Sequence, residues 1–455
     1  MKNSWESKKI LAYGKRFSIF TSIMFVLLCV FSCNNLLVLG GGSLVIAMPG
    51  TRATIASSYT IELTGTNGTP QSKTVAGGSS VQFDDLDPDT YNISVKGKDD
   101  SGLVVLYGMS NATVEAGATA SATVNLGTVA NDLNSLQQAI TTGGIVYIGS
   151  DINVTSSLTV NTDVTLLPAY KNVTLTNTTE NNSHLIHVTA GELTVSGDDN
   201  YTITLDGNKK SSTSATGIIR VEGACKLYLN QNSIVTNNGS YGVYVTGENA
   251  VNKAYVELNG GIIKDNLSSG ICLSQTEFVM NSGFIENNTC DSRSGAAVNM
   301  ASSNTSFVMK GGTITGNTVT GTTPTNGGAI NVTGGSSFTM EGGIIINNTT
   351  TGKGKGVYFA GSGSLKIGGS AVIDTSNDVY FSSSYKLSII SALTGATPVA
   401  TITFNDYGSS NPVLEAENGV KLADVIKKFK VTQPEDGSAE YIINDEGKLQ
   451  KVGAQ

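Results

Sequence analysis

The chain has 455 residues, of which 14% are charged and 53 are glycine, and its formal net charge is −8. Its apolar fraction of 39% suffices for a packed core, so the composition excludes general disorder. The negative balance argues against a nucleic-acid partner, because binding to phosphate depends on clustered Lys and Arg. A mixture rich in Gly, Ser, Thr and Asn favours short strands joined by tight turns over helices.

The first 33 residues have the pattern of an export signal. Four basic residues between positions 8 and 16 precede the apolar run FSIFTSIMFVLLCVFSC, which is too short and wrongly flanked for an ordinary membrane span. The run closes on a small residue before Cys33, which resembles the lipobox of bacterial lipoproteins, with Phe31 as a departure from that pattern. The resemblance implies a signal peptide over residues 1–32, a lipid on Cys33 and a tether over residues 33–42. An uncleaved N-terminal anchor is the alternative.

A lipid on Cys33 would hold the protein on a membrane without a spanning helix, and we expect an outer-membrane lipoprotein of the bacterial cell envelope, facing the surface or the periplasm. Removal of residues 1–32 takes away five basic residues and one acidic residue, so the mature chain is more acidic still. Cys225, Cys272 and Cys290 then remain unmodified. An odd, sparse count is not a disulfide framework and predicts buried thiols.

Residues 43–127 alternate apolar and polar positions in seven short runs broken by turn clusters, which predicts a small antiparallel β-sandwich. The segment FDDLDPDTYNISVKGKD, from Phe83, resembles the signature of prealbumin-like and carboxypeptidase-regulatory-like modules, with Asp89 where Gly is usual. That resemblance implies a spacer or stalk and carries little functional information.

The segment NDLNSLQQAI follows, and it has a helical pattern. Leu133, Leu136 and Ile140 fall on one face behind a candidate cap at Asn131, so we expect a helix that plugs the end of the next domain. Short strand-like runs then continue to Glu222 without intervening helices. Because parallel α/β sheets need helical connections, this order excludes an α/β fold.

A repeat begins at residue 227 and predicts the architecture. Six units open on a large apolar residue, at spacings of 29, 22, 29, 31 and 27, and a second apolar residue stands two positions later. Units of this length with short strands and no helix are typical of a parallel β-helix, in which equivalent residues of successive coils stack about 4.8 Å apart. We therefore expect a right-handed β-helix over residues 128–400, with a C-terminal cap over 401–455. The units open at Leu227, Val256, Phe278, Phe307, Phe338 and Leu365.

Two further positions recur in each unit. An apolar column seven residues on is predicted to face the core, and an Asn ten residues on is predicted to form an internal ladder, because stacked amides can bond from coil to coil. The predicted core column is Ile234, Ile263, Ile285, Ile314, Ile345 and Val372, and the predicted ladder is Asn237, Asn266, Asn288, Asn317 and Asn348.

The Ile-x-x-Asn motif and the sequence Gly-Gly-Ala-Ile at 327–330 resemble the repeats of polymorphic outer membrane proteins, with Ile in place of the family's Phe. The resemblance covers residues 222–383 and implies a surface-exposed β-solenoid with a role in adhesion. This chain departs from the family at its end, because residues 401–455 lack the series of alternating strands that forms a membrane barrel. A lipid anchor would take over the attachment role.

Parallel β-helices also include carbohydrate-active enzymes, so polysaccharide lyase or glycosidase chemistry is the alternative. Such chemistry needs paired carboxylates, or an acidic Ca²⁺ site beside a base. The acids of this solenoid are scattered, and the one tight group sets Lys264 and Asp265 against Glu286 of the next coil, which is typical of an exposed ion pair between coils. Asp206, before Gly207, is first of all a turn residue. We therefore predict no catalytic residues, and keep Asp206, Asp265 and Glu286 as weak binding or acid candidates.

His184 and His187 are the only histidines, and their spacing on a strand predicts opposite faces and no shared metal. No motif for a cofactor is present. A binding role remains, because the loop after the ladder Asn varies most in length and would place a protein or glycan ligand at one edge of the solenoid. Sugar stacking would depend on Tyr241, Tyr244 and Tyr358. The sequence thus predicts an adhesin-like surface module that is not an enzyme, and a purely structural envelope protein is a further alternative.

Overall fold

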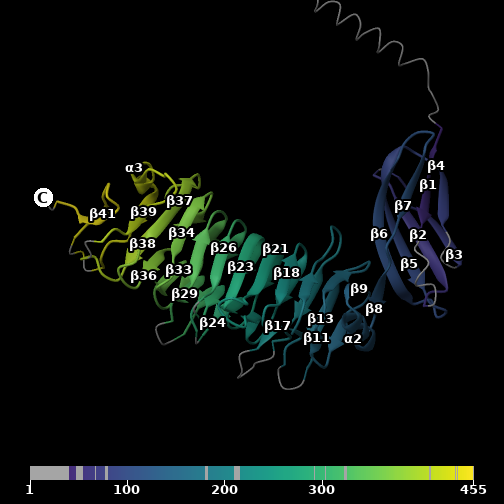
Figure 1. The fold of residues 1–455 in the computed structure, drawn as a ribbon, viewed down its shortest axis with the longest axis horizontal. Helices are drawn as coiled ribbons and strands as arrows, with labels where there is room; N and C mark the ends of the chain where they lie inside the picture. The colour runs from purple at the N-terminus through teal and green to yellow at the C-terminus, as the bar shows by residue number, and fades with distance from the viewer. Residues whose placement is uncertain are drawn as a thin grey trace, which may run out of the picture. The chain divides into compact units, whose positions relative to one another are not determined.

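The computed structural model describes residues 40–47, 55–66, 68–76, 80–179, 183–209, 216–291, 293–302, 304–321, 325–408, 411–435, 437 and 439–453 (Figure 1). The predicted signal peptide, Cys33 and residues 33–39 of the tether lie outside the described residues. The chain divides into two compact units. The first comprises Met1–Lys96 and Gly108–Leu126, and the second comprises Gly97–Tyr107 and Gly127–Gln455.

The first unit is built from strands in two separate sheets. One has the order β4-β1-β7, and in the other β2 pairs with both β3 and β5. β1 is antiparallel to β4 but parallel to β7, so this sheet is mixed, whereas the sequence predicted an antiparallel one. The strands are β1 (Gly42–Ala47), β2 (Ser58–Thr64), β3 (Gln71–Ala76), β4 (Val81–Leu86), β5 (Asp89–Lys98) and β7 (Thr119–Thr123).

In the second unit a capping helix, α2 (Leu133–Thr142), precedes the first coil. Its N-cap is Asp132, not the predicted Asn131, because the Asp132 side chain accepts a hydrogen bond from the backbone of Ser135. The helix buries Leu136, Ala139 and Ile140 against the first coil. β8 (Gly127–Ala130) pairs with β6 (Val104–Val114) and with the first solenoid strand.

The rest of the unit is a parallel β-helix with three stacks of strands, one on each side of a coil, which confirms the predicted fold class. Stack 1 holds β9 (Gly144–Ile148), β12 (Val164–Pro168), β15 (Glu192–Val195), β18 (Lys226–Asn230), the first halves of β21 (Ala254–Lys264) and β23 (Thr276–Glu286), β26 (Ser306–Met309), β30 (Ser337–Met340), β34 (Leu365–Gly369), β37 (Leu387–Leu393) and β39 (Leu414–Ala416). Stack 2 holds β10 (Ile152–Val154), β13 (Val173–Asn177), β16 (Ile203–Asp206), β19 (Ser233–Thr236), the second halves of β21 and β23, β27 (Thr313–Thr315), β31 (Ile344–Ile346) and β35 (Val372–Ile373).

Stack 3 closes the coil. It holds β11 (Leu158–Val160), β14 (Ile186–Val188), β17 (Gly217–Glu222), β20 (Tyr241–Thr246), β22 (Ile271–Ser274), β25 (Val298–Met300), β29 (Ile330–Gly334), β33 (Val357–Gly361), β36 (Val379–Phe381), β38 (Ala400–Phe404) and β40 (Phe429–Val431). A short ladder outside the three stacks joins β24 (Thr289–Cys290), β28 (Thr318–Val319) and β32 (Thr349–Thr350).

The interior of the solenoid is the stack of apolar columns that the repeat predicts. Phe278, Phe307 and Phe338 stand in register, are at most 1% exposed, and have ring centroids 4.5 and 4.9 Å apart. Met280 and Met309 lie beside them and are fully buried. Each coil therefore buries the apolar face of its neighbours, as stacked repeats must.

The core column of stack 2 differs from the prediction at both ends. Ile263, Ile285, Ile314 and Ile345 face the core with 0% exposure. In the coil before them Val235 takes this place and Ile234 faces outward, because the turn after Leu229 holds one more residue, seen as a register shift against β21. In the last of the six predicted repeat units Ile373, not Val372, continues the column.

The solenoid runs past the predicted boundary at residue 400. β38 and β40 continue stack 3 and β39 continues stack 1, all by parallel pairing. The motif fades before this point, but parallel pairing needs only backbone groups and an apolar inner face. What closes the end is α3 (Leu422–Val425), the 3₁₀ turn η3 (Ile426–Lys428) and the hairpin of β41 (Tyr441–Ile443) and β42 (Leu449–Lys451).

Candidate functional site

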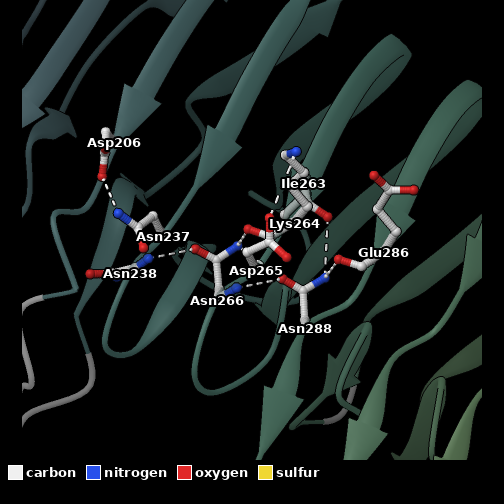
Figure 2. A network of polar contacts seen from close by, with 9 residues as sticks. All are labelled: Asp206, Asn237, Asn238, Ile263, Lys264, Asp265, Asn266, Glu286 and Asn288. Atoms are coloured by element: carbon white, nitrogen blue, oxygen red, sulfur yellow. Dashed lines mark hydrogen bonds and ion pairs between the residues drawn. The ribbon is translucent and has the colours of Figure 1, made fainter.

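A buried ladder of asparagines follows the corner between stacks 2 and 3. Asn266, Asn288, Asn317 and Asn348 are all 0% exposed. The side-chain oxygen of Asn288 accepts from both the backbone N–H (3.1 Å) and the amide (2.9 Å) of Asn266 (Figure 2). The side-chain oxygen of Asn317 accepts the same two bonds from Asn288, at 3.0 and 2.9 Å. The amides of Asn288, Asn317 and Asn348 also donate to backbone carbonyls of their own coil and the preceding coil, as in the bonds from Asn288 to Glu286 and Ile263.

The ladder begins one residue later than predicted and continues further. Asn238, not Asn237, donates its backbone N–H to Asn266, and Asn348 donates its amide to Asn377. Asn237 instead occupies the corner with φ 65°, and its amide donates to Asp206 at 2.8 Å (Figure 2). Asp265 also takes a positive φ there, since Asn and Asp tolerate this conformation better than other residues that carry a side chain. The ladder is thus a structural feature of the corner, closed to solvent.

The acid candidates lie on the outer face of stack 2. Lys264 is in register with Glu286, but its ammonium group pairs with its neighbour Asp265, at 3.7 Å, so the ion pair lies within one coil rather than between coils as predicted. Asp206 and Asp265 line one surface depression of about 640 Å³ together with Lys209 and Lys264. Glu286 is not among its lining residues. The depression is an open, charge-balanced surface that can hold a ligand by hydrogen bonds.

A second group, which sequence reasoning missed, lies on the outer face of stack 3. It is a continuous chain of contacts. The Arg293 guanidinium lies 5.4 Å from the ring centroid of Tyr241, which stacks on Tyr244 at 5.3 Å, and Arg220 lies 4.1 Å from the ring centroid of Tyr244. Arg220 also pairs with Glu222 at 3.0 Å. We call this chain, with the two histidines described next, the Arg–His cluster.

The two histidines complete the Arg–His cluster. His187 pairs with Glu222 at 3.2 Å, and its ring centroid lies 5.7 Å from that of His184. The predicted placement on opposite faces is wrong, because Leu185 and Ile186 are both buried and the alternation breaks just before β14. Among the described residues no group of three or more His, Cys, Asp or Glu side chains could hold a metal ion.

The tyrosines proposed for sugar stacking are already engaged within the protein. Tyr241 is 1% exposed, and burial raises the pKa of its hydroxyl. Tyr244 lies between Arg220 and Tyr241 in the contact chain, and Tyr358 stacks on Tyr380 at 5.6 Å. These rings therefore pack the outer face of stack 3.

Burial and neighbouring charges shift the pKa values of two further groups of the Arg–His cluster. Burial lowers the pKa of His184. A hydrogen bond with the carbonyl of Gly217 raises it, but the effect of burial is larger. Burial would raise the pKa of Glu222, but the hydrogen bond and charge of Arg220, together with His187, bring it below its usual value.

We expect the solenoid to lose stability as the pH falls below about 6.5. In the unfolded chain His184 takes up a proton near its ordinary pKa, whereas the folded chain resists protonation, so acid favours the unfolded state. The melting temperature, measured between about pH 5 and pH 8, should fall as the pH is lowered. A His184→Gln variant should show a weaker dependence of the melting temperature on pH. An unchanged slope in the variant would assign the pH dependence to other groups.

Of three comparisons with known proteins, one found a match. Residues 193–372 match a family model described as a right handed beta helix region. No curated protein matches the chain, and no solved structure does. None of the described helices is long and apolar enough to cross a membrane. The match covers the ladder from Asn238 to Asn348 and the Arg–His cluster without its two histidines, so this part of the chain is similar in sequence to right-handed β-helices.

Proposed function

We propose that the protein is an exported bacterial lipoprotein, held on the envelope through a lipid on Cys33, whose solenoid acts as an adhesin-like surface interaction module. The observation that carries this proposal is the sequence before residue 34: a basic segment, an apolar run of signal-peptide length, and a small residue directly before Cys33. An outer-membrane location is part of the same proposal. The first unit serves as the spacer between the lipid and the solenoid.

Two features support binding rather than catalysis. At the coil corner Asp206 accepts a hydrogen bond from Asn237, and Asp265 forms an ion pair with Lys264. Both carboxylates therefore have structural partners, which argues against a role in proton transfer. The connection between stacks 2 and 3 is short after β21 and longest between β27 and β29, which sets variable loops along one edge. Such an edge is where repeat proteins commonly bind a partner, and the ligand here is a protein or a glycan.

Replacing Cys33 by serine tests the anchor. We expect the native chain, produced in a Gram-negative host, to incorporate labelled palmitate, to lose residues 1–32 and to remain with membranes. The Cys33→Ser chain should incorporate no label and keep its N-terminus, while Cys29→Ser, which alters a thiol inside the apolar run, should behave like the native chain. Retention of Met1 in the native product, seen by mass spectrometry, would refute the lipoprotein proposal.

Surface display and the absence of catalysis are tested separately. Protease added to intact cells should degrade the solenoid if it faces outward. The purified chain should leave pectic, alginate and neutral polysaccharides intact, measured as reducing ends and as unsaturated uronates. Depolymerisation of any of them would instead support a carbohydrate-active enzyme.

A further inference from the structure

The last coils carry a pocket that the repeat motif does not reveal. It has a volume of about 520 Å³ and lies on the outer face of stack 1, where β34, β37 and β39 run side by side. Lys366, Ser388 and Glu415 occupy the same outward column of these three strands. Its volume falls within the range of about 300–1,000 Å³ that is usual for small-molecule sites.

Two ion pairs form the polar wall of this pocket. The ammonium group of Lys366 lies 2.9 Å from the Glu417 carboxylate, and that of Lys386 lies 2.5 Å from the Glu415 carboxylate. Ser388 donates a further hydrogen bond to Glu415 at 2.8 Å. Glu415 and Glu417 are two residues apart on an extended segment, so both project to the same side.

The polar wall is half-buried and charge-balanced. The four charged side chains are between 31% and 53% exposed, so each keeps part of its surface open to a ligand. The hydrogen bond from Lys386 holds the pKa of Glu415 below its usual value, so this carboxylate is an acceptor at neutral pH. The charges of the two ammonium groups and the two carboxylates therefore cancel, and the net charge of this wall is zero.

Apolar side chains also line the pocket. The Tyr385 ring packs edge-to-face against Phe359, with centroids 5.0 Å apart and an interplanar angle of 89°. Phe359 is 1% exposed and belongs to the solenoid core, so it anchors the tyrosine. Pro412 also lines the pocket. A ring and a proline fixed beside polar groups offer an apolar surface to a ligand that has both kinds of face.

We propose that this pocket binds an uncharged saccharide of two or three sugar rings. A hydroxyl group both donates and accepts, whereas a carboxylate only accepts and an ammonium group only donates. Neighbouring sugar hydroxyls can therefore donate to Glu415 or Glu417 and accept from Lys386 or Lys366. The C–H face of the ring packs on Tyr385 and Pro412.

The charge balance selects against ionic ligands. A uronate or a phosphate would meet two carboxylates, and a cationic peptide would meet two ammonium groups, so each would leave a like charge close by. The inference concerns a place other than the variable loop edge, and it depends neither on the lipid nor on surface display. Failure of the lipoprotein proposal would leave it untouched.

Saccharide titration of the full-length chain, in a detergent without a sugar headgroup, tests the proposal. The probes are soluble neutral oligosaccharides of glucose, galactose and mannose, with oligogalacturonate as the charged comparison. Saturation-transfer NMR detects contact and calorimetry measures affinity. We expect binding of at least one neutral series and weaker or no binding of oligogalacturonate.

Conservative variants assign that binding to the pocket. Glu415→Gln and Glu417→Gln should each weaken neutral binding by roughly tenfold or more, since a charged hydrogen-bond acceptor is lost. Glu446→Gln is the matched control, because Glu446 forms an exposed ion pair with Lys448 in the hairpin that closes the solenoid and does not line the pocket. Affinity should stay unchanged in this control. Binding of none of the neutral series, preference for oligogalacturonate, or equal affinity in all three variants would overturn the proposal.

Discussion

Replacing Phe307 by alanine is expected to destabilise the solenoid by about 3–5 kcal/mol, the range found when a large buried aromatic side chain is truncated. The Phe307 ring stacks on Phe278 from one side and on Phe338 from the other, at 4.5 and 4.9 Å. Its removal opens a cavity bounded by both rings. The neighbouring backbone cannot close that cavity, because each strand is held in register by the coils before and after it.

The measurement is denaturant unfolding followed by hydrogen exchange of the coils around Phe307, because stacked repeats need not unfold in one step. Val308→Ala is the matched control. Val308 is the next residue of β26 and points outward, so its truncation should cost less than about 1 kcal/mol. An equal decrease in the free energy of unfolding in the two variants would mean that the Phe column does not form the core.

Replacing Asn317 by alanine is expected to cost about 3 kcal/mol, although the residue is polar. Its side chain accepts two bonds from Asn288 and donates to Ile285, Thr315 and Asn348, all inside the protein. Alanine leaves several of these groups buried without a partner, and each such group costs about 1–3 kcal/mol. We expect faster amide exchange at Asn288, whose N–H then loses its acceptor.

Asn281→Ala provides the comparison. The amide of Asn281 also donates to a neighbouring Asn, and it lies 2.7 Å from the side-chain oxygen of Asn259. This pair lies on the outer face of stack 1, where Asn281 is half-buried. Water can replace the lost amide there, so the cost should stay below about 1 kcal/mol. A cost for Asn317→Ala as low as this would show that water reaches the inner ladder as well.

The core of the solenoid could be predicted from the sequence because its apolar residues recur at the same position of each repeat unit. Phe278, Phe307 and Phe338 recur at the same place in each unit, and a residue that must stack on its own equivalent leaves a periodic signal. The signal weakens where two neighbouring residues fit equally well. Ile234 and Val235, like Asn237 and Asn238, offer two registers one residue apart, and only the length of the preceding turn decides between them.

The groups on the outer faces were harder to predict, for a physical reason. Arg220 and Arg293 lie in different coils, and nothing in the sequence shows that Tyr241 and Tyr244 connect them. A search for columns could have found part of the Arg–His cluster, since His187, Arg220 and Tyr244 occupy one register position. The pocket at Glu415 was missed because one of its three strands, β39, was assigned to the cap, so the sequence did not place Glu415 beside Lys366 and Ser388.

The left-handed residues at the corners have a consequence for how such a chain changes in evolution. Each coil from Asn238 to Asn377 has its own corner and its own ladder Asn, and its inner apolar residues stack on their equivalents in the coils before and after it. A whole coil could therefore be duplicated or lost without altering the cross-section, and each added coil would lengthen the rod by about 4.8 Å. The reach of the module is thereby set by the number of coils, independently of the side chains on its outer faces.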